Sequence, residues 1–269
     1  MTKFVMPTRE QETNKGSFGK ILSICGCDNY TGAAYLSAAS ALRVGAGLVT
    51  LASTPKVIST VATLLPEAIY LERTKCVKKI RDFSVTLIGC GLGLNHQSQQ
   101  IFSIVLKQLL KDTIPTVIDA DGLNILAQKQ IKLNENFIIT PHPLEAARLL
   151  SQDVRIVLAD IETAAKKLTS KYNCITVLKT HRTVICNTDL SIHINKFGNS
   201  ALAKSGTGDV LAGVISGLIA QNLPLFEAAK LGVYLHSRAG EIASKELSEY
   251  SVLAHDLLYY LPKAILEIA

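Results

Sequence analysis

The sequence lacks long charge blocks and long apolar runs, and these absences exclude several classes of protein. Its 28 Lys and Arg residues exceed its 22 Asp and Glu residues by 6, but the excess is dispersed, so a nucleic-acid-binding arm is not indicated. The longest apolar stretch, 210–220, is about half the ~20 residues that a membrane helix needs. The first residues also lack the apolar core of a signal peptide. We therefore expect a soluble, cytoplasmic protein without membrane partners.

Closely spaced cysteines are also scarce. Of the six cysteines, only Cys25 and Cys27 lie near each other, and their C-x-C spacing is not the C-x-x-C of redox or zinc motifs. Most of the others lie inside apolar, strand-like runs, where cysteine behaves as a small hydrophobic residue. We expect reduced thiols in the core rather than a disulfide framework or a metal site.

The remaining composition is that of a folded domain. The chain has 269 residues, of which 48% are apolar and 19% charged, so it can bury a substantial core. No linker rich in Pro, Gly or Ser interrupts it, and no internal repeat is present. We expect one domain over residues 1–269, with residues 1–15 irregular.

Short apolar runs alternate with longer helical patterns along most of the chain. The runs are rich in Val, Ile and Thr and show little polar alternation, which is typical of parallel strands covered on both faces. They lie at 21–26, 47–53, 85–89, 116–121, 137–140 and 175–180. Helices are expected between them, for example at 31–44, 98–111 and 154–172. The repeated β-α-β order predicts a three-layer α/β/α fold with a mostly parallel central sheet.

The last third of the chain departs from this rhythm. Two short apolar runs within 183–195 are separated by a turn-like Asn-Thr-Asp, which predicts a hairpin and an antiparallel edge of the sheet. After the hairpin the pattern becomes helical at 208–221, 225–247 and 253–267.

The strongest chemical signal is the loop G-N-S-A-L-A-K-S-G-T-G-D, residues 198–209, which runs directly into an apolar helical pattern. Gly206 and Gly208 allow backbone amides to converge, and the helix start adds free N–H groups and a positive dipole end, which together favour an anion such as phosphate. The negative charge of Asp209 would repel an anion bound at this loop. A carboxylate here therefore suggests a separate role, for example accepting a proton from a hydroxyl nucleophile. The alternative is that Asp209 is only a favourable partner of the helix dipole.

A second signal is T-P-H-P-L-E, residues 140–145, which follows a predicted strand. The prolines stiffen the loop around His142, and ligands of open α/β sheets bind beyond the carboxyl ends of the strands. His142 is therefore a candidate substrate contact. The equally open alternative is a capped helix start, with Pro143 in the first turn and Glu145 near the dipole.

Small and polar residues follow other predicted strands, at 26–34, 89–93 and 119–124, and Lys179 ends another strand. These strand ends share one edge of the sheet. Several such stretches at the same edge indicate a ligand site more strongly than any single stretch does. Lys179 at the strand end could meet a phosphate or ribose, although an ordinary solvated turn remains open. The glycines of 89–93 do not complete the G-x-G-x-x-G dinucleotide fingerprint.

Four stretches carry a resemblance to a known family. They are G-A-A-Y-L-S-A-A-S-A-L-R-V-G-A-G-L-V, D-A-D-G-L-N-I-L, T-P-H-P-L-E and N-S-A-L-A-K-S-G-T-G-D-V-L-A-G. In this order they resemble the ADP/ATP-dependent NAD(P)H-hydrate dehydratase family, which belongs to the ribokinase-like superfamily. The resemblance runs from about residue 16 to 261. The family is often fused to an epimerase domain, for which this chain has no room, so it resembles the stand-alone dehydratase.

The resemblance implies a metabolite-repair reaction. The family restores NADH or NADPH from the S-form of its 6-hydrated derivative, by transferring a nucleotide phosphoryl group to the C6 hydroxyl and then eliminating phosphate. Asp209 would be the base, and Gly206, Thr207 and Gly208 the anion hole. The hydrated dinucleotide would contact Ala33, Ala34, Gly93, Asp121, Asn124, His142 and Asp209. ADP or ATP would contact Lys179, Thr180, His181, Arg182, Thr183, Asn199 and Gly208.

The resemblance also implies Mg²⁺, which would bridge the nucleotide phosphates mostly through water, with Glu145 and Asp121 as candidate carboxylates. A homo-oligomer, such as a tetramer, is expected. The chain departs from the family at Thr180, Ser205 and Cys90, where glycine, glycine and proline are commoner. Two other hypotheses remain: a ribokinase-like kinase of a hydroxymethyl-pyrimidine or thiazole alcohol, and a dinucleotide-binding module or dehydrogenase, which the missing fingerprint disfavours.

Overall fold

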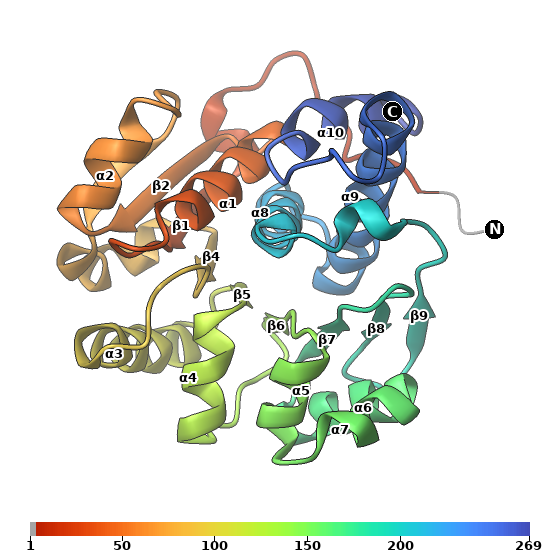
Figure 1. The fold of residues 1–269 in the computed structure, drawn as a ribbon. Helices are drawn as coiled ribbons and strands as arrows, with labels where there is room; N and C mark the ends of the chain where they lie inside the picture. The colour runs from red at the N-terminus through yellow and green to blue at the C-terminus, as the bar shows by residue number, and fades with distance from the viewer. Residues whose placement is uncertain (1–3) are drawn as a thin grey trace.

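A single mixed sheet organises the chain. The computed structural model describes residues 4–269, and residues 1–3 lie outside the described part. In residues 4–269 nine strands pair in the order β3-β2-β1-β4-β5-β6-β7-β8-β9 (Figure 1). They are β1 (Lys20–Ile24), β2 (Leu48–Ser53), β3 (Ile69–Glu72), β4 (Val85–Ile88), β5 (Thr116–Ile118), β6 (Phe137–Ile139), β7 (Ile175–Leu178), β8 (Val184–Cys186) and β9 (Ile192–Ile194).

The pairing confirms the predicted sheet. Every pair from β3 through to β7 is parallel. Strand β8 pairs antiparallel with both β7 and β9, which is the predicted edge hairpin. Residues 4–14 hold neither helix nor strand, and η1 begins at Lys15, within the 1–15 that we expect to be irregular. Residues 1–3 of that expectation lie outside the described residues, and the single domain over 1–269 stays a prediction.

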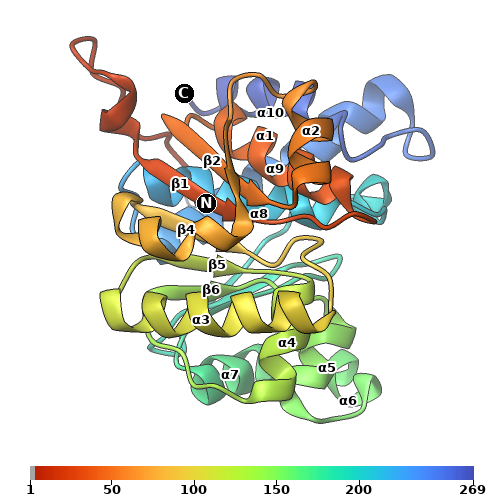
Figure 2. The same cartoon turned by 90° about the vertical axis from the view of Figure 1, so that its left-hand side faces the viewer.

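Helices cover both faces of the sheet. One face carries α1, α2, α8, α9 and α10, and the other carries α3 to α7 (Figures 1 and 2). The helices are α1 (Thr31–Arg43), α2 (Pro55–Ala62), α3 (His96–Asp112), α4 (Asp121–Lys129), α5 (Pro143–Leu150), α6 (Val154–Ala159), α7 (Ile161–Tyr172), α8 (Thr207–Ala220), α9 (Leu225–Leu247) and α10 (Leu257–Leu266). Short 3-10 turns are η1 (Lys15–Phe18), η2 (Arg73–Lys75), η3 (Val77–Asp82) and η4 (Ser200–Leu202).

Two apolar cores lie on opposite sides of the sheet, because successive strand residues point to opposite faces. Leu87 and Val117 join the core beneath α1, α8 and α9, whereas their neighbours Ile88 and Ile118 join the core beneath α3, α4 and α7. This is the predicted three-layer α/β/α architecture. All six cysteines are free thiols, and all except Cys27 are buried, as expected for core residues.

Two predicted helix boundaries were wrong, and one short strand was missed. The segment 154–172 is not one helix, because Asp160 interrupts it: the Asp160 side chain accepts a hydrogen bond from the Thr163 amide at 2.9 Å and begins α7. The last helix begins at Leu257 rather than Leu253, since the Asp256 carboxylate accepts from the Leu253 amide and closes a turn there. The short strand β3 is absent from the predicted strands. No helix of residues 4–269 combines the length and apolarity needed to cross a membrane.

Helix α8 packs so closely against α1 that one position tolerates no side chain. A Cβ on Gly213 would lie 2.1 Å from both the Ser37 carbonyl oxygen and the Ser40 hydroxyl of α1. This contact matters for the site because α8 begins at the edge of the sheet where the parallel strands end. The packing against α1 therefore fixes where the first turn of α8 stands.

We expect Gly213→Ala to destabilise the protein by about 1–3 kcal/mol, because the added methyl group forces α8 away from α1. Gly32→Ala is the matched control: Gly32 lies in the first turn of α1, and a Cβ there would have no heavy atom within 4 Å. That variant gains up to ~1 kcal/mol from helix propensity. Urea unfolding measures both, and equal stability of the two variants would contradict the close packing.

Candidate active site

The loop before α8 presents free backbone amides. Gly206 has a φ of +91°, a conformation that favours glycine, and it caps the helix without a side chain. Within residues 4–269 no acceptor pairs with the amides of Gly208 and Asp209. The Thr207 hydroxyl is turned away from these amides, 2.8 Å from the Leu202 carbonyl oxygen. The start of α8 therefore has the free donors and positive dipole end that hold an anion.

A buried ion pair lies beside this helix start. The Lys179 Nζ lies 2.7 Å from Asp119 Oδ1, and the Thr140 hydroxyl donates to the same oxygen at 2.7 Å. The side chains of Asp119 and Lys179 are 2% and 19% exposed. A Cβ on Gly208 would lie 3.3 Å from Lys179 Nζ, so the ammonium stands directly against the first turn of α8. The ends of β5, β6 and β7 thus converge on α8.

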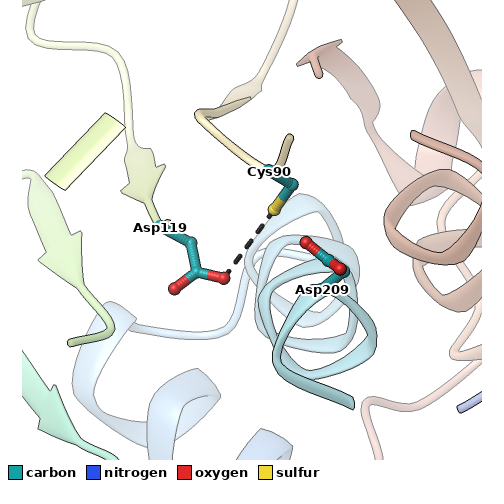
Figure 3. A group of neighbouring side chains, drawn as sticks. All are labelled: Cys90, Asp119 and Asp209. Atoms are coloured by element: carbon teal, nitrogen blue, oxygen red, sulfur yellow. Dashed lines mark hydrogen bonds between the residues drawn. The ribbon is translucent and has the colours of Figure 1, made fainter. Parts of the chain in front are cut away.

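Asp209 faces this ion pair. Its carboxylate, the Cys90 thiol and the Asp119 carboxylate lie within 4.8 Å of one another (Figure 3). The Cys90 thiol contacts Asp119 Oδ2 at 3.8 Å, so Asp119 uses one oxygen for Lys179 and turns the other toward Cys90 and Asp209. Asp209 is therefore more than a partner of the helix dipole, because it points into a charged cluster at the sheet edge.

Burial and like charge change the acidity of this cluster. Burial, followed by the negative charge of Asp119, raises the pKa of Asp209 from 3.8 to about 7, although Lys179 acts in the opposite direction. Burial lowers the pKa of Lys179, but the charges of Asp119 and Glu145 outweigh it, so the pKa lies above its usual value. Lys179 is therefore a cation at neutral pH, while Asp209 sits near the midpoint of its titration, where a general base is most effective.

His142 forms the cap of α5. Its Nδ1 accepts from the amides of Leu144 and Glu145 at 3.2 and 3.3 Å, and the Glu145 carboxylate accepts from the His142 amide at 2.8 Å. Burial and the charge of Lys179 lower the pKa of His142, so its ring is neutral at neutral pH. The capped-helix interpretation is thus confirmed. Contact of His142 with a dinucleotide stays a prediction.

Other predicted dinucleotide contacts lie in the loops after β1 and β4. The Gly93 amide donates to Asp121 Oδ2 at 2.8 Å, which ties the β4 loop to the start of α4. Ala33 is half-buried in the first turn of α1, but Ala34 is fully buried in the core and exposes no side chain. Asn124 accepts a hydrogen bond from Arg148 at 2.8 Å.

Only one of the residues expected to contact the nucleotide through its side chain lies in the Asp119 cluster. Lys179 joins the Asp119 cluster, whereas 180–183 form a turn with internal bonds, such as that from the Thr183 hydroxyl to the Thr180 carbonyl oxygen. His181 and Arg182 are exposed. Asn199 caps η4 and donates to the Ser244 hydroxyl at 2.7 Å, so its side chain is used within the fold.

From the sequence, Asp119 and Cys90 are included only within strand-end stretches and not as site residues, and Glu145 is given the role of a metal candidate or of a partner of the helix dipole. In the structure Glu145 is buried and its carboxylate lies 4.0 Å from Lys179 Nζ. A signal for Asp119 is present, because it is the first residue after a buried strand, at the edge where ligands of open sheets bind. Cys90 also lies in one of the strand-end stretches, 89–93, but a lone cysteine is more often a small buried hydrophobic residue than a site residue.

Comparisons with known proteins decide the family. The profile of the NAD(P)H-hydrate dehydratase family matches residues 21–263. The chain belongs to this family. The ADP-dependent (S)-NAD(P)H-hydrate dehydratase of Neisseria meningitidis is 36% identical over 88% of this chain and 81% of its own length. The bifunctional NAD(P)H-hydrate repair enzyme of Coxiella burnetii is 36% identical over 96% of this chain, which spans only 52% of that relative's length.

Solved structures agree with this assignment. A ribokinase-like superfamily protein from Enterococcus faecalis has a TM-score of 0.91 and 31% identity over 98% of this chain and 93% of its own. The ADP/ATP-dependent NAD(P)H-hydrate dehydratase of Bacillus subtilis, co-crystallised with ATP/Mg²⁺, has a TM-score of 0.88 and 31% identity over 98% of this chain and 95% of its own. The predicted family and ribokinase-like fold are both confirmed.

The carboxylates of this dehydratase-family site do not form a magnesium cage. The Glu145 and Asp121 oxygens accept from the amides of His142 and Gly93, and Asp119 is neutralised by Lys179. The third member of the nearby donor set is the Cys90 thiol, a soft ligand that suits Mg²⁺ poorly. The residues of 4–269 therefore do not fit a Mg²⁺ held by protein carboxylates alone.

We expect Asp209→Asn to stabilise the fold at high pH and not at low pH. Since the folded protein raises this pKa, it binds more protons than the unfolded chain between pH 3.8 and about 7, so stability falls as pH rises through that window. The neutral amide of the variant removes this loss of stability. Its free energy of unfolding should therefore exceed that of the unsubstituted protein by about 1–2 kcal/mol at about pH 8, the scale for a partly exposed carboxylate.

Asp153→Asn is the control, because Asp153 is exposed and the hydrogen bond from Arg155 lowers its pKa, so this substitution brings no gain at high pH. Urea unfolding at about pH 4 and about pH 8 measures both variants. A gain for Asp209→Asn that is the same at both pH values would show that the carboxylate is not the cause.

Proposed function

We propose that this chain catalyses the nucleotide-dependent dehydration of the S-form of 6-hydrated NADH or NADPH, a metabolite-repair reaction. The observation that carries this proposal is the Asp209 carboxylate, with a pKa of about 7, at the start of a helix whose first amides are free. The activity named for the Neisseria meningitidis relative supports it.

The reaction needs a better leaving group than hydroxide. Transfer of a phosphoryl group from ADP or ATP to the C6 oxygen forms a P–O bond and breaks the bond to the remaining nucleotide. Asp209 accepts the hydroxyl proton as that oxygen attacks. Phosphate then leaves with the C6 oxygen, the nicotinamide nitrogen supplies the electron pair, and loss of a proton restores NADH or NADPH.

The start of α8 and Lys179 act on the transferring group. The amides of Gly208 and Asp209 donate toward the phosphoryl oxygens, where fixed donors in a partly buried site stabilise developing charge. The Lys179 ammonium stands beside Gly208 and adds positive charge at the same place. Because Asp119 holds that ammonium, and the Thr140 hydroxyl in turn donates to the same Asp119 oxygen, the position of the ammonium does not need to change during the reaction.

Mg²⁺ would be bound together with the nucleotide, where it would neutralise part of the phosphate charge. Mg²⁺ usually keeps several waters and binds substrate phosphates with few protein carboxylates, which agrees with the engaged oxygens of Glu145 and Asp121. The Bacillus subtilis relative was co-crystallised with ATP/Mg²⁺, which supports a magnesium–nucleotide cosubstrate. The expected homo-oligomer and the cytoplasmic location stay predictions.

A coupled assay separates this function from the kinase alternative. The protein is mixed with hydrated NADH or hydrated NADPH, Mg²⁺, and either ADP or ATP, while nicotinamide absorbance and phosphate release are followed. Recovery of the reduced nicotinamide with equimolar phosphate is the expected result. The kinase alternative would be favoured if neither ADP nor ATP supports recovery and the protein instead phosphorylates a hydroxymethyl-pyrimidine or thiazole alcohol.

In this assay we expect Asp209→Asn to lower kcat/KM by ~10²-fold or more, because the amide cannot accept the proton. For the unsubstituted protein kcat/KM should fall as pH drops below about 7, where Asp209 becomes protonated, and this dependence should vanish in the variant. Asp153→Asn on the distant α6 cap should behave as the unsubstituted protein. Near-normal turnover of Asp209→Asn would refute the assigned role.

A further inference from the structure

Arg73 is a buried cation outside the cluster around Asp209. It follows β3 in the short turn η2 and is only 6% exposed. Among the residues of 4–269, no carboxylate lies within 4.0 Å of its guanidinium. Burial lowers the pKa of Arg73, although the side chain remains a cation at any physiological pH. A buried arginine without an acidic partner is unusual, since buried charges are normally paired.

The hydrogen-bond acceptors of Arg73 are backbone carbonyls of two loops. Its Nη1 donates to the Leu92 carbonyl oxygen at 3.2 Å, in the loop after β4. The same nitrogen lies 3.5 Å from the Gly26 carbonyl oxygen, in the loop after β1. These two loops are far apart in the sequence, and Arg73 comes from a third segment. One guanidinium therefore joins two loops at the same edge of the sheet.

The two loops also touch each other closely. A Cβ on Gly91 would lie 2.7 Å from Tyr30 Cβ and 2.8 Å from Ala33 Cβ, so the β4 loop rests directly on the start of α1. A Cβ on Gly93 would lie 3.3 Å from the Cys27 sulfur. The loops thus form one continuous surface, and a shift of either would displace the other.

This surface carries two of the expected contacts to the hydrated dinucleotide, Ala33 and Gly93. We infer that Arg73 is a positioning residue that holds the β1 and β4 loops together and thereby sets the affinity for the dinucleotide. The inference rests on the proposed function for the identity of the ligand. Arg73 makes no hydrogen bond to Asp119, Lys179 or Asp209, so its loss should weaken dinucleotide binding and leave the chemical step largely intact.

Steady-state kinetics with varied hydrated dinucleotide and saturating nucleotide test this inference. Arg73→Met removes the donor and the charge, and it should raise KM for the hydrated dinucleotide by ~10-fold or more, the scale of a lost charge-assisted hydrogen bond. The change in kcat should stay within ~3-fold, because an interaction made equally in the ground state and the transition state affects KM alone. KM for the nucleotide and the pH profile should not change.

Two further variants keep the test decisive. Arg73→Lys retains the charge and one donor, so it should recover part of the lost affinity, and it serves if Arg73→Met does not fold. Arg81→Met is the matched control, since Arg81 is exposed in η3 and pairs with Asp112 rather than with a loop. A normal KM in Arg73→Met, or a fall in kcat with KM unchanged, would overturn the inference.

Direct binding of NADPH, the product, separates this inference from the proposed function. If the unsubstituted protein binds NADPH but restores none from its hydrate, the proposed function fails while the Arg73 comparison still stands. Calorimetric affinity for NADPH should then fall from the unsubstituted protein to Arg73→Lys and again to Arg73→Met. Equal affinity in all three proteins would overturn the role of Arg73.

Discussion

The pair formed by Lys179 and Asp119 governs the charge of the site. One ammonium group lies near three carboxyl groups at a partly buried edge of the sheet. It is 2.7 Å from Asp119 and 4.0 Å from Glu145, and its charge also acts on Asp209. The Lys179 Nζ lies 2.7 Å from Asp119 Oδ1, so these two side chains form an ion pair. Burial raises the pKa of both other carboxyls to about 7. With a pKa of about 7, the Asp209 carboxyl can both accept and release a proton at neutral pH, as a general base requires.

The fold brings these groups together because parallel strands end at one edge. Strand β5 supplies Asp119 at its carboxyl end, β6 leads to His142 and Glu145, and β7 delivers Lys179. Helix α8 packs against α1 through Gly213 and starts beside these strand ends. The free amides of Gly208 and Asp209 and the Asp209 carboxylate thus come from one helix turn, as the proposed phosphoryl transfer requires. At the same edge of the sheet, the Arg73 guanidinium joins the loops that follow β1 and β4.

Much of this arrangement can be predicted from the sequence, and the failures have physical reasons. The glycine-rich loop before an apolar helix correctly indicates the start of α8, because few other sequences permit that turn. The sequence pattern favours Asp121 over Asp119, although strand alternation distinguishes them: Val117 faces the α8 side and Ile118 the other, so Asp119 returns to the α8 side. Asp121 instead accepts from Gly93. Arg73 could not be found, since its partners are carbonyls remote in sequence.

The proton affinity of Asp209 is the quantity on which this account depends. It is measured most directly by following the carboxyl carbon of Asp209 by NMR through a pH titration of the unliganded protein, with Asp209→Asn to assign the resonance. We expect a midpoint near pH 7. A midpoint near the ordinary aspartate value of about 4 would contradict the account, because the carboxylate would then be too weak a base for the proposed role.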